Sequence, residues 1–600
     1  MDPINCQNIL ALLQKFSSMP VVQSLLTEMK TLSRQELIPF YHKAIPILEQ
    51  HIWGNNEIDS DIAVFQGLFR EFEQMLEPEK DLQHDLIIII PVADRPRQLE
   101  NCLQSIISIC DAFGYGGKST HYNKVSVLIA EDSQCEDTRF ANKALADSFT
   151  RQGLLVTYFG IEEQQTLVKK MSILSEMPLD SIIKTKDYNN YYHKGASTTR
   201  NITYLKLNEL IQNKDRTLCY FIDSDQEFKI NIMVKGKEKS LTAINYFYYL
   251  NKIFTDKKIQ ILTGKVVGDP PVSPSVMVAN YLADVDAFLN RLTKSYLSSH
   301  CQFHSDNDHH YTDDAAYHDM AGLLGFEQQK STYDYTCELK GEHSNEDCFI
   351  EYSKKINRFF DGEHLTRRTC YQYMDVYESI RPARTVYTGN YILSSKALRY
   401  FIPFANLKFR MAGPTLGRFI KNEIAEKFIS ANLPMLHGRI AEEQQTSEFR
   451  PGIEHNEDGV SLSVEYERQF YGDVMLFSVE EILSSNSQFE LNDIQSIVIK
   501  TEASLREQYK EKLDLVNTLV TRLKRQVARL SEHSTKKEFR QAIDRVSLFI
   551  KNIENNFTEN SYAKSLVCSN HYDKNKINAI VMAISQYQSV STNWKKLLKL

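Results

Sequence analysis

Short, uninterrupted apolar runs are the feature that most restricts how this chain can fold. They span residues 86–92, 125–130, 154–159, 218–223 and 259–264, with helix-length stretches between several of them. A strand without polar alternation must be covered on both faces, and strands that alternate with helices form mainly parallel sheets. The sequence therefore predicts an α/β fold with a Rossmann-like, mainly parallel sheet.

The rest of the chain divides into segments of different character. At 600 residues it is too long for one hydrophobic core, because single cores stop growing at about 250–300 residues. We interpret residues 1–82 as a helical N-terminal segment, 83–490 as the α/β domain and 491–600 as a helical C-terminal region. Residues 295–380, which are polar and rich in His, Asp and Tyr, are predicted to be a loop-rich insertion. Three prolines interrupt the helical spacing of the N-terminal segment: Pro20, Pro39 and Pro46.

The C-terminal region carries an apolar stripe whose spacing alternates between four and three residues. Its members are Tyr509, Leu513, Val516, Val520, Leu523, Val527 and Leu530. Thr535 and Glu538 then match a capping box, and a second stripe starts at Phe539. These stripes predict an antiparallel helical hairpin, with a homodimer through the same helices as the alternative.

Composition excludes several classes of function. The net charge of −7 is spread along the chain, with no basic stripe, so nucleic acid is not an expected partner. No apolar run reaches the roughly 18–20 residues of a membrane span, and the N-terminus does not resemble a secretory signal. The ten cysteines are scattered without a CxxC pair. We therefore expect free thiols and a cytoplasmic protein.

A group of histidines in the predicted insertion also invites a metal site. His300, His304, His309, His310 and His318 lie among aspartates. Their spacing fits no standard zinc pattern, so a solvated or mobile loop is the favoured interpretation.

Polar residues at the ends of the apolar runs are the best candidates for chemistry, because ligands bind beyond the carboxyl ends of strands in open α/β sheets. The run at 218–223 ends in Asp223-Ser224-Asp225. Two carboxylates next to a buried strand repel each other and are costly unless compensated. A divalent cation is the natural compensation, and oxygen ligands select Mn²⁺ or Mg²⁺.

Three further segments accompany this Asp-x-Asp pair. The first apolar run ends in Pro91, followed by Asp94 and Arg95. The second ends in Glu131-Asp132-Ser133, for which a plain helix N-cap is the alternative interpretation. Residues 194–201 then combine Gly195 and small hydroxyl residues with Arg200-Asn201.

Taken in order, these four segments resemble the GT-A glycosyltransferases, and among them the family 2 group. Members of that group share a proline-containing turn, an acidic pair after the second strand, a Gly-to-Arg-Asn helix start and an Asp-x-Asp. The resemblance covers about 140 residues. It implies a GT-A catalytic domain that uses Mn²⁺ or Mg²⁺ and a nucleotide-sugar donor carrying UDP or GDP. It also implies a hexosyl transfer to a hydroxyl of a glycan, a small molecule or a protein.

The resemblance also assigns roles to individual residues. It implies that the donor site is lined by Pro91, Asp94, Arg95, Glu131, Asp132, Gly195 and Ser224. Asp132 would accept a hydrogen bond from the nucleotide base. Arg200 would bind the donor phosphate or sugar, with a surface ion pair as the alternative. Asp225, with Asp223, would ligate the metal. Glu131 stands where the family often has Asp.

The match is weaker after the Asp-x-Asp. Gly389-Asn390 resembles the family's Gly-Asn segment beside the sugar. No carboxylate follows this segment closely. The catalytic base that would deprotonate the acceptor is therefore not identified, and both inversion and retention at the sugar carbon stay open. The nearest acidic pair is Glu346-Asp347, which precedes the Gly-Asn segment, and Asp347 is the candidate catalytic residue of this pair. His437 is the expected third metal ligand, with a structural histidine as the alternative.

Two rival functions remain from the sequence. A haloacid-dehalogenase-like phosphotransferase also uses a strand-terminal Asp-x-Asp, but Gln226 and Glu227 follow here and three strand-like runs precede. A degenerate transferase that acts as a scaffold is the second rival, and the intact carboxylates at 223 and 225 argue against it.

Overall fold

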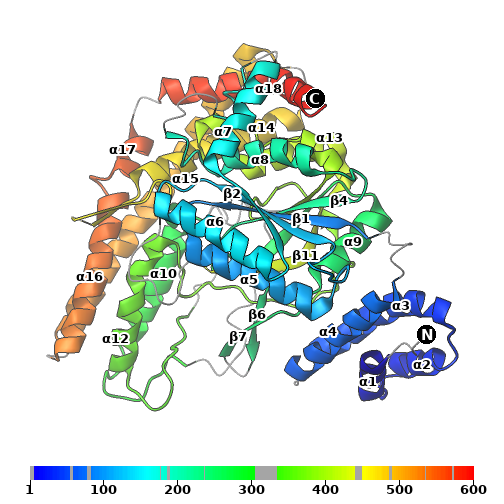
Figure 1. The fold of residues 1–600 in the computed structure, drawn as a ribbon. Coiled ribbons are helices and arrows are strands. Elements are labelled where there is room, and N and C mark those ends of the chain that lie inside the picture. Colours follow the sequence, from blue (N-terminus) through cyan, green and yellow to red (C-terminus); the bar gives the residue numbers. More distant parts are fainter. Residues whose placement is uncertain are drawn as a thin grey trace.

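The computed structural model describes most of the chain. The described residues are 6–54, 58–76, 83–175, 178–184, 190–234, 237–304, 334–438, 449–457, 459–485, 489–533, 536–569 and 573–599. His309, His310, His318 and Thr535 lie outside them. Figure 1 shows a central sheet with helices on both faces, the N-terminal helices on one side and the long C-terminal helices on the other.

A nine-stranded mixed sheet forms the centre of the molecule. Its order is β3-β2-β1-β4-β10-β8-β11-β5, and β9 pairs with β11. The strands are β1 (Asp85–Val92), β2 (Val125–Glu131), β3 (Leu155–Phe159), β4 (Thr217–Ile222), β5 (Gln226–Glu227), β8 (Ile261–Gly268), β9 (Arg381–Pro382), β10 (Asn390–Ser394) and β11 (Phe428–His437). All five apolar runs are strands of this sheet. This confirms the prediction of an α/β fold.

Strand β10 breaks the parallel arrangement. It pairs antiparallel to β4 on one side and to β8 on the other, whereas β3, β2, β1 and β4 are mutually parallel. β10 begins at Asn390 of the Gly-Asn segment, and Asn390 pairs with Ile222, the last residue of β4 before Asp223. Two small hairpins lie outside the main sheet: β6 (Ile230–Val234) with β7 (Lys237–Leu241), and β12 (Glu454–Asn456) with β13 (Gly459–Ser461).

Both faces of the sheet are covered, which explains the uninterrupted apolar runs. Along β1, Ile88 and Ile90 pack into the core beneath α5 (Pro96–Phe113), α6 (Glu136–Arg151) and α9 (Tyr246–Lys257). Ile89 packs into the opposite core with α7 (Ile161–Leu174), α8 (Ala196–Leu210) and α13 (Ala412–Ile424). Successive strand residues point to opposite faces, so each face needs its own apolar set.

The N-terminal segment is helical, as predicted, but its prolines do not all end helices. It consists of α1 (Gln7–Lys15), α2 (Pro20–Met29), α3 (Arg34–Trp53) and α4 (Ile58–Met75). Pro20 starts α2, whereas Pro39 and Pro46 lie inside α3. The prediction of a break at these two positions is wrong. The buried face of α3, which includes Tyr41 and Leu48, shares the core of the sheet, and that packing offsets the lost backbone hydrogen bonds.

The predicted insertion is only partly loop in the described residues. Helix α12 (Asn345–Lys355) forms within it, and Cys348, Phe349 and Tyr352 are fully buried there. These side chains join a second core with α10 (Pro274–Leu292) and the C-terminal helices. Burial of one helix face therefore replaces the expected loop.

The C-terminal region consists of helices that pack against one another and against the rest of the chain. All seven residues of the first stripe are buried in α15 (Leu491–Ser531), which packs against α16 (Lys537–Phe557). The same helix also packs against α10, α14 (Ser463–Ser484), α17 (Tyr562–Cys568) and α18 (Lys574–Leu597). The apolar stripe of α15 is thus buried against helices of the same chain, so it gives no support for a dimer through this helix.

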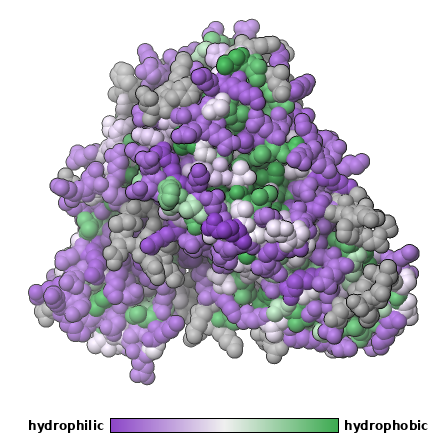
Figure 2. All heavy atoms as spheres, viewed as in Figure 1, coloured by the Kyte–Doolittle hydropathy of each residue, from purple (hydrophilic) through white to green (hydrophobic). Residues whose placement is uncertain are grey.

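Figure 2, in the same view, shows a face that is mostly hydrophilic with smaller groups of apolar residues. Among the described residues, no helix combines the length and the apolar character needed to span a membrane.

The buried Asp473 generates a pH-dependent prediction for the helical core. It lies in α14 and accepts hydrogen bonds from the Tyr509 hydroxyl and from Gln469 Nε2 (2.8 Å). Burial raises the pKa of Asp473 to about 7, although these two hydrogen bonds and the charge of Lys512 act in the opposite direction. The folded protein therefore holds a proton that the unfolded chain releases near pH 3.9.

Because the folded state binds this proton more tightly, Asp473 should lower the free energy of unfolding as pH rises from about 4 to about 7. Asp473→Asn should remove that dependence. Between pH 5 and pH 7, wild type should lose about 2–3 kcal/mol more stability than the variant. Denaturant titrations of both proteins at each pH measure this difference. Equal losses would contradict the prediction.

Candidate active site

Asp225 is the centre of the candidate site. It follows β4, and its side chain is 4% exposed. Arg95, in the turn after β1, donates from Nη1 to Asp225 Oδ2 at 2.8 Å. His437 Nε2 lies 3.6 Å from the same oxygen. The ends of β1, β4 and β11 thus bring three groups together that are far apart in the sequence.

Strand pairing positions His437. It ends β11 and stands opposite Gln226 of the short strand β5, directly after the Asp-x-Asp. Its Nδ1 lies 2.7 Å from the Asp269 carbonyl oxygen. A carbonyl can only accept, so Nδ1 carries a proton, and in the neutral ring Nε2 presents its lone pair towards Asp225. Metal-binding histidines are commonly oriented in this way.

Asp223 faces a different partner. Its Oδ1 accepts a hydrogen bond from Nη2 of Arg200, which is buried in the second turn of α8. The Asp223 side chain is 37% exposed. Gly389 packs so closely that a Cβ there would lie 2.7 Å from Asp223 Oδ2. Ser224, between the two aspartates, is buried.

Asp132 forms a buried ion pair that fixes the start of α8. Its Oδ1 lies 2.7 Å from Lys194 Nζ and accepts from the Lys194 amide at 3.0 Å, while Oδ2 accepts from the Gly195 amide. Burial lowers the pKa of the Lys194 ammonium, and the charge of Asp132 limits that decrease. Gly195 has φ +96°, a conformation that favours glycine.

Asp94 connects the turn after β1 to the loop after β2. Its carboxylate accepts from the amides of Gln134 and Cys135, and its own amide donates to Ser133 Oγ at 2.7 Å. His193 Nε2 lies 2.6 Å from Asp94 Oδ2. Asp94 thus positions the loops of the site through contacts within the protein.

His193 and Phe449 form a stacked pair beside this connection. Their ring centroids are 3.8 Å apart and their planes differ by 3°. The Phe449 carbonyl accepts from Arg95 Nη2 at 3.3 Å. Neither residue is among those predicted from the sequence. No local pattern marks Phe449, whereas the position of His193 just before the Gly195 segment could have drawn attention to it.

Two predicted donor-site residues make their hydrogen bonds inside the protein. Glu131 is fully buried, and its carboxylate accepts from the Asp132 and Ser133 amides, from Asn142 Nδ2 and from Tyr158. Asn390 is also fully buried, with Nδ2 on the Lys265 and Leu433 carbonyls. Their environments are those of structural residues. Pro91 lies in β1 and is half-buried.

The structure does not bring Asp347 to the other predicted residues. It occupies the third position of α12, in a capping box with Ser344. Hydrogen bonds from the Ser344 hydroxyl and amide lower the pKa of Asp347. Helix α12 packs against α16 in the helical core. A lowered pKa and a capping role are unfavourable for a general base.

The donor set around Asp225 fits a divalent cation. A carboxylate oxygen and an imidazole nitrogen face one another, and imidazole and carboxylate are both accepted by Mn²⁺. Asp223 Oδ1 is bonded to Arg200, so Oδ2 is the oxygen that would complete the set. The guanidinium of Arg95 compensates the charge of Asp225.

Comparisons with known proteins give only distant similarities. No family model and no curated protein matches the chain. Among solved structures it is similar to mannosyltransferase PcManGT from Pyrobaculum calidifontis in complex with GDP-Man and Mn²⁺, at 7% identity and a TM-score of 0.29, over 85% of this chain and 96% of that one. It is also similar to S. aureus TarS at 10% identity and a TM-score of 0.25, over 80% and 59% of the two chains. The chain is similar to S. aureus TarS 1–349 at 11% identity and a TM-score of 0.25, over 84% of this chain and 91% of that one. Similarity at these TM-scores does not establish a function, which is inferred from the residues of the site.

The buried pair of Asp132 and Lys194 predicts a stability effect. Asp132→Ala would leave the Lys194 ammonium buried without its carboxylate, which should lower the free energy of unfolding by about 3–5 kcal/mol. The double variant Asp132→Ala/Lys194→Met removes both charges and should recover most of that loss. Chemical denaturation of the three proteins measures both effects. A single variant within about 1 kcal/mol of wild type, or a double variant no better than the single, would contradict the pairing.

Proposed function

We propose that the chain is a metal-dependent glycosyltransferase of the GT-A type. It would transfer a hexosyl group from a UDP- or GDP-sugar to a hydroxyl of a glycan, a small molecule or a protein. The observation that carries the proposal is the convergence of Asp225, His437 and Arg95 at the ends of β4, β11 and β1. This is the edge of an open α/β sheet where ligands bind.

The residues around Asp225 have complementary tasks in this proposal. Asp225 and His437 would hold Mn²⁺ or Mg²⁺, with Asp223 as a further oxygen ligand. When bound, the cation neutralises charge on the nucleoside diphosphate leaving group. Arg95, whose guanidinium now contacts Asp225, carries positive charge to the place where the diphosphate would lie. Fixed positive charge at this place favours the developing anion without reorganisation.

Other residues would act by positioning. Asp94 and Asp132 hold the loops after β1 and β2 through the amides of residues 134, 135, 194 and 195. Arg200 is buried and would orient Asp223 beside the donor. Close contact between Gly389 and Asp223 keeps β10 next to that carboxylate. These contacts fix the ends of the strands relative to one another.

Removal of the Asp225 carboxylate should abolish donor turnover. Wild type should bind one class of nucleotide-sugar and hydrolyse it slowly only with Mn²⁺ or Mg²⁺, and Asp225→Asn should lose both properties. His437→Ala should weaken the apparent metal affinity by at least about tenfold, because even the outer partners of metal ligands contribute roughly 10- to 100-fold. Calorimetry and release of nucleoside diphosphate across a panel of UDP- and GDP-sugars measure these effects.

A matched control for this experiment is Asp215→Asn. Asp215 is 80% exposed and pairs with Lys396 on the surface, so its loss should leave turnover unchanged. If wild type binds no nucleotide-sugar with either metal, the transferase proposal fails and a non-catalytic scaffold takes its place.

The packing of Gly389 against Asp223 makes a separate prediction. A Cβ at position 389 would lie 2.7 Å from Asp223 Oδ2 and 2.9 Å from Gln226 Nε2, so Gly389→Ala must displace the Asp223 carboxylate. Turnover of the donor should fall at least about tenfold, because small misplacements at a reacting site are costly. Gly54→Ala is the control, since a Cβ there meets only ordinary contacts. Initial rates for both variants check the prediction, and wild-type activity in Gly389→Ala would contradict it.

A further inference from the structure

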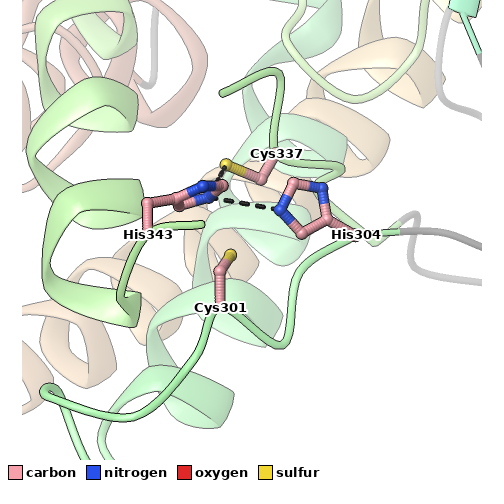
Figure 3. A group of neighbouring side chains, drawn as sticks. All are labelled: Cys301, His304, Cys337 and His343. Carbon is pink, nitrogen blue, oxygen red and sulfur yellow. Dashed lines mark hydrogen bonds between the residues drawn. The ribbon is translucent and has the colours of Figure 1, made fainter. Parts of the chain in front are cut away.

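A second cluster of metal-ligating side chains lies outside the proposed active site. It consists of Cys301, His304, Cys337 and His343, whose ligand atoms all lie within 4.8 Å of one another. Figure 3 shows the four side chains pointing towards a common centre from two loop segments. One segment follows α10 and the other precedes α12. We propose that these residues form a structural zinc site of the Cys₂His₂ type.

The distances between the ligand atoms suit a tetrahedral ion. His304 Nε2 and His343 Nε2 are 3.2 Å apart, and Cys337 Sγ lies 3.3 Å from His343 Nε2. Zinc bonds of about 2.0–2.1 Å to nitrogen and about 2.3 Å to sulfur place two nitrogens about 3.4 Å apart and a nitrogen and a sulfur about 3.6 Å apart. These two pairs need to expand by only a few tenths of an ångström to hold the ion, and all other pairs of ligand atoms lie within 4.8 Å of one another.

The orientation of His343 supports a ligand role. Its Nδ1 lies 2.8 Å from the Gly341 carbonyl oxygen, so Nδ1 is the protonated nitrogen. The Nε2 lone pair therefore faces Cys337 and His304. A zinc-bound histidine usually donates its other ring N–H to a carboxylate, a backbone carbonyl or water.

The backbone holds the two segments side by side. The Cys301 amide donates to the His343 carbonyl at 2.9 Å, and the Cys337 amide donates to the Phe303 carbonyl at 2.7 Å. His300 and Ser344 form an antiparallel bridge at the edge of the cluster. Cys301 and Cys337 are 36 residues apart in the sequence. Main-chain contacts between their two segments therefore help to position the four ligand side chains.

The chemistry of the ligands selects zinc and a structural role. Thiolate and imidazole ligands together favour zinc over Mg²⁺ or Mn²⁺. Cys301 and Cys337 are buried, whereas His304 is exposed and His343 half-buried, so the ion can enter from the surface. Four protein ligands leave no open position for a substrate, as in structural sites. Binding would tie the loop after α10 to the start of α12.

Cys568 provides a control cysteine, because it is exposed at the end of α17 and does not belong to the group of four. His300 provides a control histidine, because it is exposed next to Cys301 and also stands outside the group. Replacement of either residue should leave the ligand set intact.

The test is the metal content of the full-length protein purified without chelator. Wild type, Cys568→Ser and His300→Ala should each contain about one zinc ion per chain by elemental analysis. Cys301→Ser and His343→Ala should contain at least tenfold less, because a structural site needs its full ligand set. Asp225→Asn should keep its zinc, which separates this site from the proposed donor site.

Two further measurements apply to wild type alone and do not depend on the folding of a variant. Replacement of zinc by Co²⁺ should give the visible absorption of a tetrahedral ion with thiolate ligands, and a strong chelator should lower the melting temperature. Wild type without zinc, a Cys301–Cys337 disulfide in peptides mapped without reduction, or zinc retained in Cys301→Ser and His343→Ala would overturn the proposal.

Discussion

Charge compensation at one edge of the central sheet is the constraint on which the rest of the structure depends. Parallel strands buried on both faces deliver Asp132, Asp223 and Asp225 to the same edge, where carboxylates repel each other. Each is held by a cation from another segment: Lys194, Arg200 and Arg95. These ion pairs join the turn after β1, the loop after β2 and the start of α8. The geometry of the candidate site is a consequence of that joining.

The second determinant of the site is the antiparallel part of the sheet. Strand β10 lies between β4 and β8, and β11 follows β8. This order carries the Gly389 segment to Asp223 and places His437 beside Asp225, although more than 160 residues separate these groups along the chain. The buried amide of Asn390 secures the arrangement, because it donates to backbone carbonyls of both β8 and β11. A buried amide that is fully bonded favours one strand register over others.

The helical extensions form part of the folded core. The N-terminal helices share a core with β1 and α5, and α15 packs against α10, α14, α16 and α18. The end of α18 returns to the α8 side of the sheet, where Trp594 is fully buried and donates to the Leu398 carbonyl. The Cys-His cluster lies where α10 and α12 join this helical core. The two proposed metal sites therefore belong to different layers, one at the sheet edge and one among the helices.

Local patterns in the sequence were sufficient for the strands, the α15 stripe and the position of the Asp-x-Asp after a buried strand. Each of these features depends on neighbours within a few residues. A strand that is covered on both faces of the sheet appears in the sequence as an uninterrupted apolar run. Only the tertiary structure decided that α3 continues through Pro39 and Pro46, that Glu131 bonds internally and that Asp347 caps α12. It also brought Cys301 and His304 to Cys337 and His343, a pattern invisible to local spacing. Such features depend on contacts between residues that are distant in the sequence, and packing energy from those contacts overrides local preference.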